Sequence, residues 1–182
     1  MKGQVVYKIR KLVNLIKRSN NINMHVVNKA IQSELSNTTF VGDFQVRWNT
    51  TYDMVERFSE FRDIIDDITY KPRTIEGLKE NKKEELKKLS LNSEDWKRVE
   101  ILIKVLKPFK EVTDLLQGQK YQTLALANVA EKMILEYFEN LEDTDFTEKC
   151  VVDELKEYFI KYLDTKVTIE QKKISLVIKH IL

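Results

Sequence analysis

An arginine and a tryptophan stand next to each other in the stretch DFQVRWNTTYDMV, which covers residues 43–55. Trp48 is large and sits beside the cation Arg47, just ahead of Asn-Thr-Thr, a composition typical of a helix start. One interpretation is that Trp48 anchors a core and that Arg47 pairs with a nearby carboxylate, Asp43 or Asp53. The other is that the pair belongs to a site that handles nucleic acid. The residues by themselves leave both interpretations open.

Basic residues gather at the N-terminal end of the chain. Residues 1–29 contain no Asp or Glu, whereas residues 136–157 are rich in acids. Lys and Arg neutralise phosphates whatever the base sequence, so a stripe of cations in the first segment could follow a phosphate backbone. The stripe consists of Lys8, Arg10, Lys11, Lys17 and Arg18. Because Tyr7 is its one interleaved aromatic, a solvated helix face is the competing interpretation.

Several other chemistries are disfavoured by residue type. Cys150 is the one cysteine, so the chain can form no internal disulfide and no thiolate zinc cluster. His25 and His180 are far apart and lack Cys or Asp partners at metal-ligand spacing. Four scattered glycines cannot make a glycine-rich phosphate loop. We therefore predict no metal site and no cofactor in this chain.

Composition bounds the class of protein. A chain of 182 residues can form one domain or two small ones, and its apolar share of 42% supplies a core. Four Gly and two Pro leave few turns, which favours long helices over a multi-stranded sandwich. The formal charge of +2 points to no partner. No apolar run approaches the roughly 20 residues of a membrane span, so we expect a soluble, intracellular protein.

The first half of the chain reads as helices joined by one extended segment. Apolar residues at helical spacing predict a helix over residues 5–18 and a second one that ends at Ser36–Asn37. Met24, Val27, Ile31 and Leu35 are the residues whose spacing predicts the second helix. At most one short strand is expected, around residues 39–47. The next helix should begin with Asn49 or Thr50 as its N-cap and continue to about residue 68.

The second half is also predicted to be helical. Residues 70–91 should form a loop and an exposed helical stretch, and Ser93 should cap a helix that ends near residue 117, before Gly118. Pro108 predicts a kink near residues 104–108. Further helices are expected over residues 123–141, 147–163 and 168–182, with a linker at 142–145. The expected fold class is mainly α, a bundle-like arrangement of helices.

Three stretches resemble the hAT family of transposases and the BED-finger proteins derived from it. Residues 43–57, DFQVRWNTTYDMVER, are similar to the pattern D-x-x-T-R-W-N-S-T-x-x-M-L-x-R. Residues 96–117, WKRVEILIKVLKPFKEVTDLLQ, resemble the helix W-x-x-(I/L)-x-x-(I/L)-x-x-(I/L)-L-x-P-F-x-x-(A/V)-T. Residues 121–124, YQTL, match the step Y-P-T-(I/L). The departures are Val46 for the usual Thr and Gln122 for the usual Pro. The resemblance covers most of residues 5–140.

The resemblance implies a fold and a reaction that this chain would hold only in part. Members have an RNase H-like fold interrupted by a helical insertion, and three carboxylates hold divalent metal, Mg or Mn, for strand cleavage and transfer. Two of those acids precede the helices seen here and the third follows them. We therefore expect a middle fragment that is no enzyme by itself. Residues 1–48 would be the tail of an RNase H-like part, and residues 49–182 a truncated insertion domain.

The resemblance also assigns roles to the opening pair. In the family, the Trp is implicated in stacking on a flipped base, so Trp48 would stack and Arg47 would contact a phosphate. The ancestral function would be transposon-end DNA binding and strand transfer in the nucleus. The alternative is a domesticated helical module that binds a protein partner or itself and retains no DNA chemistry.

Overall fold

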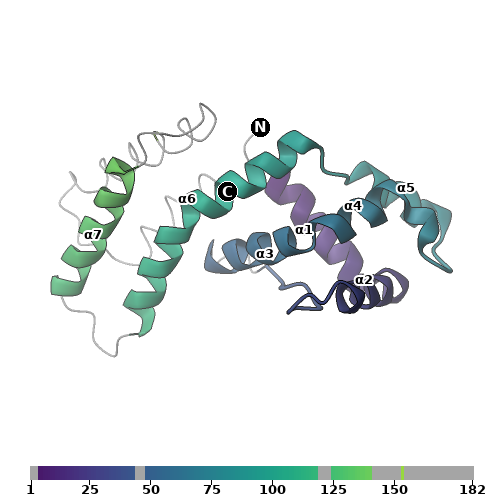
Figure 1. Cartoon of the computed structure of the whole chain (residues 1–182), viewed down its shortest axis with the longest axis horizontal. Coiled ribbons are helices and arrows are strands. Elements are labelled where there is room, and N and C mark those ends of the chain that lie inside the picture. The colour runs from purple at the N-terminus through teal and green to yellow at the C-terminus, as the bar shows by residue number, and fades with distance from the viewer. Residues whose placement is uncertain (1–3, 44–47, 119–123, 141–152, 154–182) are drawn as a thin grey trace. The chain divides into compact units, whose positions relative to one another are not determined.

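The structure is a computed structural model. It describes residues 4–43, 48–118, 124–140 and 153. Within these residues the chain forms seven α-helices and one 3-10 turn, and no strand (Figure 1). The predicted mainly helical class is confirmed. Of the segment around residues 39–47, the part that is described contains no strand, and residues 44–47 lie outside it. The linker and helices predicted beyond residue 141 also lie outside the described residues, as does residue 123, where a further helix is expected to begin.

The chain divides into two compact units, Met1–Glu100 and Ile101–Leu182. The first unit holds helices α1 to α5 and the start of α6. The second holds the rest of α6 and α7. The division at residue 48 that the resemblance implies concerns ancestry and stays a prediction.

Helix α1, Gln4–Arg18, is the predicted helix 5–18. Its apolar residues recur every three or four positions, so they form one continuous stripe along the helix. The stripe is buried to within a few per cent and contains Val5, Val6, Ile9, Leu12, Val13, Leu15 and Ile16. Helix α1 packs against α2 and α3.

Helix α2, Asn20–Gln32, buries residues other than those whose spacing predicts it. Its buried residues are Ile22, Val26 and Ala30, whereas Met24 and Ile31 are 55% and 60% exposed. Both sets have helical spacing, so periodicity could not decide between them. Helices α1 and α2 are separated by Ser19 alone. This short connection orients α2 so that Ile22, Val26 and Ala30 meet the core. The residues whose spacing predicts this helix are therefore not the ones that it buries.

The end of α2 also differs from the prediction. Glu34 adopts a positive φ of 52°, and its N–H bonds to the carbonyl of Ile31 at 3.1 Å. The N–H of Leu35 bonds to the carbonyl of Ala30 at 3.0 Å, which completes a Schellman motif. The helix therefore stops at Gln32 instead of continuing to Ser36–Asn37, although no glycine marks the turn.

The helix predicted from Asn49 or Thr50 to residue 68 is two helices. These are α3, Trp48–Glu60, and α4, Arg62–Tyr70, with Phe61 between them. Asn49 and Thr50 lie inside the first turn of α3, so the predicted cap position was wrong. The predicted apolar face is nevertheless buried in full: Met54, Val55, Phe58, Phe61, Ile64, Ile65 and Ile68. The break at Phe61 keeps both halves of this stripe on the core.

An aromatic cluster fills the centre of the first unit. The Phe61 ring lies 4.5 Å from that of Phe40, and the Phe58 ring stacks on Trp96 at 5.6 Å, measured between ring centroids. The indole N–H of Trp96 donates to Asp66 at 3.1 Å, which satisfies the polar edge of a buried ring. The guanidinium of Arg62 lies over the Trp96 ring at 5.2 Å.

Residues 71–91 form the predicted loop and exposed helix. After the 3-10 turn Pro72–Thr74, helix α5, Glu80–Lys88, buries only Leu86 among its own residues. Its charged surface is laced by ion pairs three residues apart, such as Lys87 with Glu84 at 2.7 Å. The hydrogen bond from Lys87 lowers the pKa of the Glu84 carboxyl.

Helix α6, Ser93–Gly118, begins with a cap one residue earlier than predicted. The side chain of Asn92 accepts the N–H of Asp95 at 2.7 Å, and Asp95 accepts the N–H of Asn92 at 3.3 Å. This reciprocal pair has the form of a capping box, so Asn92 is the cap and Ser93 is the first helical residue.

Helix α6 continues through Pro108. Proline has no N–H, so it offers no donor to the carbonyl four residues before it, at Lys104. The hydroxyl of Tyr137 on α7, Leu124–Glu139, donates to that carbonyl at 3.2 Å. In the same unit the rings of Phe109 and Phe138 meet edge to face at 5.9 Å. The kink predicted near residues 104–108 stays a prediction.

Two matched substitutions in α2 test which of its faces is buried. Ile22→Ala removes a side chain that is fully buried, and we expect it to lower the free energy of unfolding by about 2–5 kcal/mol. Ile31→Ala truncates an exposed side chain, and its effect should stay within about 0.5 kcal/mol. Urea denaturation followed by circular dichroism measures both. A larger loss for Ile31→Ala would mean that the face with Met24 and Ile31 is the buried one.

Candidate nucleic-acid interface

Asp43 ties the start of α3 to α1. Its side chain is only 6% exposed, and one carboxylate oxygen accepts the Thr51 hydroxyl at 2.8 Å and the Thr50 hydroxyl at 3.3 Å. The other oxygen accepts the guanidinium N–H of Arg10, which also donates to the Thr51 hydroxyl at 3.2 Å. Hydrogen bonds thus engage both oxygens of Asp43 from inside the fold.

A second ion pair joins α1 to the start of α6. The ammonium of Lys8 lies 2.7 Å from the carboxylate of Asp95, and it also donates to the carbonyl of Ser90 at 3.4 Å. Asp95 is the carboxylate of the α6 capping box, so one acid holds a helix start and a neighbouring helix together. Of the five cations proposed to contact phosphate, Lys8 and Arg10 therefore hold elements of the fold together.

The other three cations of the stripe, Lys11, Lys17 and Arg18, are exposed. The ammonium of Lys11 lies 5.3 Å from the centre of the Tyr7 ring, a cation–π contact one helical turn long. Within the part of the chain that the structure describes, Lys11 and Arg18 pair with no acid.

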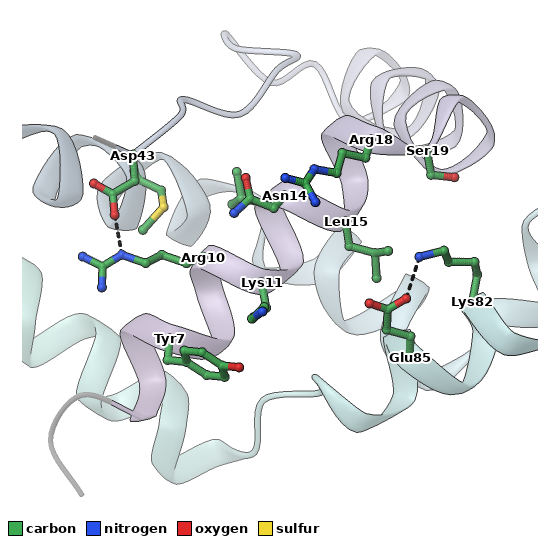
Figure 2. A pocket seen from close by; sticks show the side chains of 12 residues that line it. Tyr7, Arg10, Lys11, Asn14, Leu15, Arg18, Ser19, Asp43, Lys82 and Glu85 are labelled. Atoms are coloured by element: carbon green, nitrogen blue, oxygen red, sulfur yellow. Dashed lines mark hydrogen bonds and ion pairs between the residues drawn. The ribbon is translucent and has the colours of Figure 1, made fainter. Parts of the chain in front are cut away.

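A groove of about 400 Å³ runs along this face of α1 in the first unit. Arg10 and Asp43 line one side, and Lys82 and Glu85 of α5 line the other (Figure 2). Lys82 and Glu85 form an ion pair of 2.7 Å. In this view Lys11 lies between the two ion pairs. Basic side chains thus gather around a concave surface as well as along a helix.

The Arg47–Trp48 step lies at the point where α3 begins. Trp48 is the first residue of the helix, while Arg47 and the Trp48 side chain lie outside the described residues. Whether Arg47 pairs with Asp43 or Asp53 stays a prediction; among the described residues Asp43 pairs with Arg10. The neighbouring Asn49 has a buried side-chain oxygen without a hydrogen-bond partner in the described part of the chain.

Sequence reasoning missed the contribution of α5 to this site. Lys82 and Glu85 belong to a charged run that indicates a solvated helix, and nothing in that run says that it faces α1. Asn14 was missed for a similar reason, since a single Asn in an amphipathic helix carries no signal. Only the spacing of Tyr7, Lys11, Asn14 and Arg18 at intervals of three, four or seven could have indicated a common face.

Two negative findings bound the site. Among the described residues, no group of three or more His, Cys, Asp or Glu side chains is placed to hold a metal ion. In the same residues, no helix is both long and apolar enough to cross a bilayer.

An all-helical unit with a basic groove defines a helical domain, in contrast to the sheet of an RNase H-like catalytic core. The chain belongs to the family described as the ZBED1 RNase-like helical domain, whose model matches residues 1–105, more than half of the chain. This match confirms the resemblance to hAT-derived proteins at the level of the family. No curated protein and no solved structure matches the chain significantly.

The Asp43 network predicts a loss of stability on mutation. Asp43→Ala removes the buried carboxylate that accepts from Arg10, Thr50 and Thr51, and we expect the free energy of unfolding to fall by about 1–3 kcal/mol. The matched control is Glu100→Ala, which breaks the exposed pair between Arg62 and Glu100 and should cost less than about 1 kcal/mol. Denaturation in urea measures both, and equal losses would contradict a structural role for Asp43.

Proposed function

We propose that this chain is a DNA-binding helical part of a hAT transposase-derived protein and that it performs no strand transfer by itself. One observation supports the proposal most. The Arg10–Asp43–Thr51 network attaches the start of α3, where the Arg47–Trp48 step lies, to the helix that carries the exposed cations. Hydrogen bonds therefore connect the helix that begins at Trp48, the proposed stacking residue, to the helix that carries the proposed phosphate contacts.

The exposed cations suit a backbone contact. Each phosphate that Lys11, Lys17 or Arg18 neutralises releases condensed counterions, which favours binding at low salt whatever the sequence. Trp48 would add stacking on an unpaired or flipped base, which is equally tolerant of sequence. Lys8 and Arg10 contribute indirectly in this proposal, because their ion pairs with Asp95 and Asp43 hold α1 in place.

Strand cleavage would require the three carboxylates that hold Mg or Mn in full-length members of the family. By resemblance, these acids lie outside the stretch that the chain represents, so the chain would act by binding. We also propose a nuclear location, which the resemblance to hAT proteins supports.

Trp48→Ala tests the stacking role. We expect it to weaken DNA binding by about 5- to 150-fold, which corresponds to the loss of one stacked base. The measurement is fluorescence anisotropy of a labelled duplex with an unpaired end, titrated with the whole chain. Trp48→Phe keeps an aromatic face and should retain most of the affinity. If Trp48→Ala leaves the affinity unchanged, Trp48 has only a structural role and the stacking proposal is wrong.

A triple substitution tests the phosphate contacts. Replacing Lys11, Lys17 and Arg18 by Gln should reduce the slope of log affinity against log salt for duplex DNA by about two to three. The charge-matched control replaces Lys71, Lys79 and Lys88, which are exposed on other elements, by Gln. Equal effects of both triples would mean that net charge alone, and no defined face, attracts DNA.

The exposed face of α2 supports a second candidate function, self-association. The exposed residues of this helix, Asn20, Asn21, Met24, Asn28, Ile31 and Gln32, carry no charge, in a chain that is 33% charged. Two copies of such a face can meet across a two-fold axis without like-charge repulsion. A large exposed Met and Ile at helical spacing would form the centre of that contact.

Ile31→Glu tests self-association. A charge buried in an apolar contact is unfavourable, so we expect a dimer of the wild-type chain to become a monomer in light scattering after size-exclusion chromatography. Asn81→Glu adds the same charge on the exposed surface of α5 and should leave the dimer intact. A monomeric wild-type chain at high concentration would rule out this candidate.

A further inference from the structure

The groove between α1 and α5 has one wall formed by a single face of α1. Tyr7, Lys11, Asn14 and Arg18 lie four, three and four residues apart, so successive residues follow each other along the helix surface. In Figure 2 these side chains project from one stretch of α1, with Lys82 and Glu85 across from them. The wall therefore offers, in order, a ring, an ammonium, an amide and a guanidinium.

The charge of the groove is positive after its ion pairs are counted. Four cations line it, Arg10, Lys11, Arg18 and Lys82, together with two acids, Asp43 and Glu85. Each acid pairs with one cation, Asp43 with Arg10 and Glu85 with Lys82. Lys11 and Arg18 remain without an acidic partner in the described chain, so the groove suits an anionic ligand.

The spacing of these two cations indicates what kind of anion fits. Seven residues separate Lys11 from Arg18, which at 1.5 Å per residue places their backbones about 10 Å apart along the helix. A single phosphate could contact both cations only if the two long side chains converged on it, whereas a chain of phosphates can contact each where it lies. A polymeric anion fits this wall better than a mononucleotide does.

Tyr7 adds an exposed ring to this wall, and binding a ligand that carries only negative charges would not require one. Its side chain is 55% exposed, and it lies one turn before Lys11. The ammonium of Lys11 rests over the ring in an exposed cation–π contact, which is weak. A phosphate that attracts this ammonium would leave the ring face open for a base.

We propose that this groove binds a short stretch of single-stranded nucleic acid, with phosphates at Lys11 and Arg18 and one base stacked on Tyr7. A single strand fits because its base faces are accessible, whereas a duplex hides them in its own stack. The proposal rests on the DNA-binding function proposed above and extends it from the Arg47–Trp48 step to a second contact on α1. Asn14, between the two cations, can hydrogen-bond a base edge or a sugar.

The test measures binding of the whole chain to a labelled oligothymidylate of about 12 nucleotides and to a blunt duplex. We expect Tyr7→Ala to weaken binding of the single strand by about 5- to 150-fold and to leave binding of the duplex nearly unchanged. Tyr7→Phe keeps the ring and should restore the affinity. Tyr70→Ala removes an equally exposed tyrosine from α4 and should have no effect on either ligand.

Replacing Lys11 and Arg18 by Gln should lower the salt slope for the single strand by about 0.7 for each residue. Because both side chains are exposed, these variants should keep the wild-type circular dichroism spectrum. An unchanged slope in both variants would overturn the proposal.

The outcomes separate this proposal from the function on which it rests. If Trp48→Ala weakens DNA binding and Tyr7→Ala does not, the DNA-binding function stands and the groove proposal is overturned. If the wild-type chain binds neither ligand, both are overturned. If polyglutamate displaces the single strand and Tyr7→Ala has no effect, the groove is a site for acidic peptides, and the proposal is wrong.

Discussion

Helix α1 brings five cations into the fold and no acid of its own. Its apolar stripe has to be buried, and burying it brings Lys8 and Arg10 close to the packed interior. A partly buried cation without a counter-charge is strongly unfavourable, so acids must come from elsewhere in the chain. Asp43 and Asp95 supply them, 33 and 87 residues away. The same two acids order the starts of α3 and α6, so neutralising α1 also positions the elements around the groove.

The fold class and most helices could be predicted because their apolar residues repeat over several turns. Helix α1 has a single strong stripe and agrees with its prediction, whereas α2 has two stripes of similar spacing, and the larger residues Met24 and Ile31 belong to the one that is not buried. The one-residue connection to α1 decides the orientation of α2, and the periodicity of α2 alone does not reveal that orientation. The break at Phe61 could not be predicted either, because no Pro or Gly marks it. In the fold the Phe61 ring packs against Phe40 at this point.

The candidate site could be predicted as a list of cations but not as an arrangement. Composition identifies the basic stripe, yet it gives no way to separate Lys8 and Arg10, which pair inside the fold, from Lys11 and Arg18, which remain exposed. That separation depends on where Asp43 and Asp95 lie in space. The groove also needs α5, whose charged run gives no indication of the helix that it faces.

The ion pair between Lys8 and Asp95 has a consequence for synthesis on the ribosome. Helix α1 leaves the exit tunnel before the segment that carries Asp95, because this acid is translated 87 residues after Lys8, a delay of about 4–17 seconds at 5–20 residues per second. Trp96, which closes the aromatic cluster, follows Asp95 directly. During this interval the apolar stripe of α1 has no complete core to pack against. The first unit can therefore close only when almost all of it has been translated.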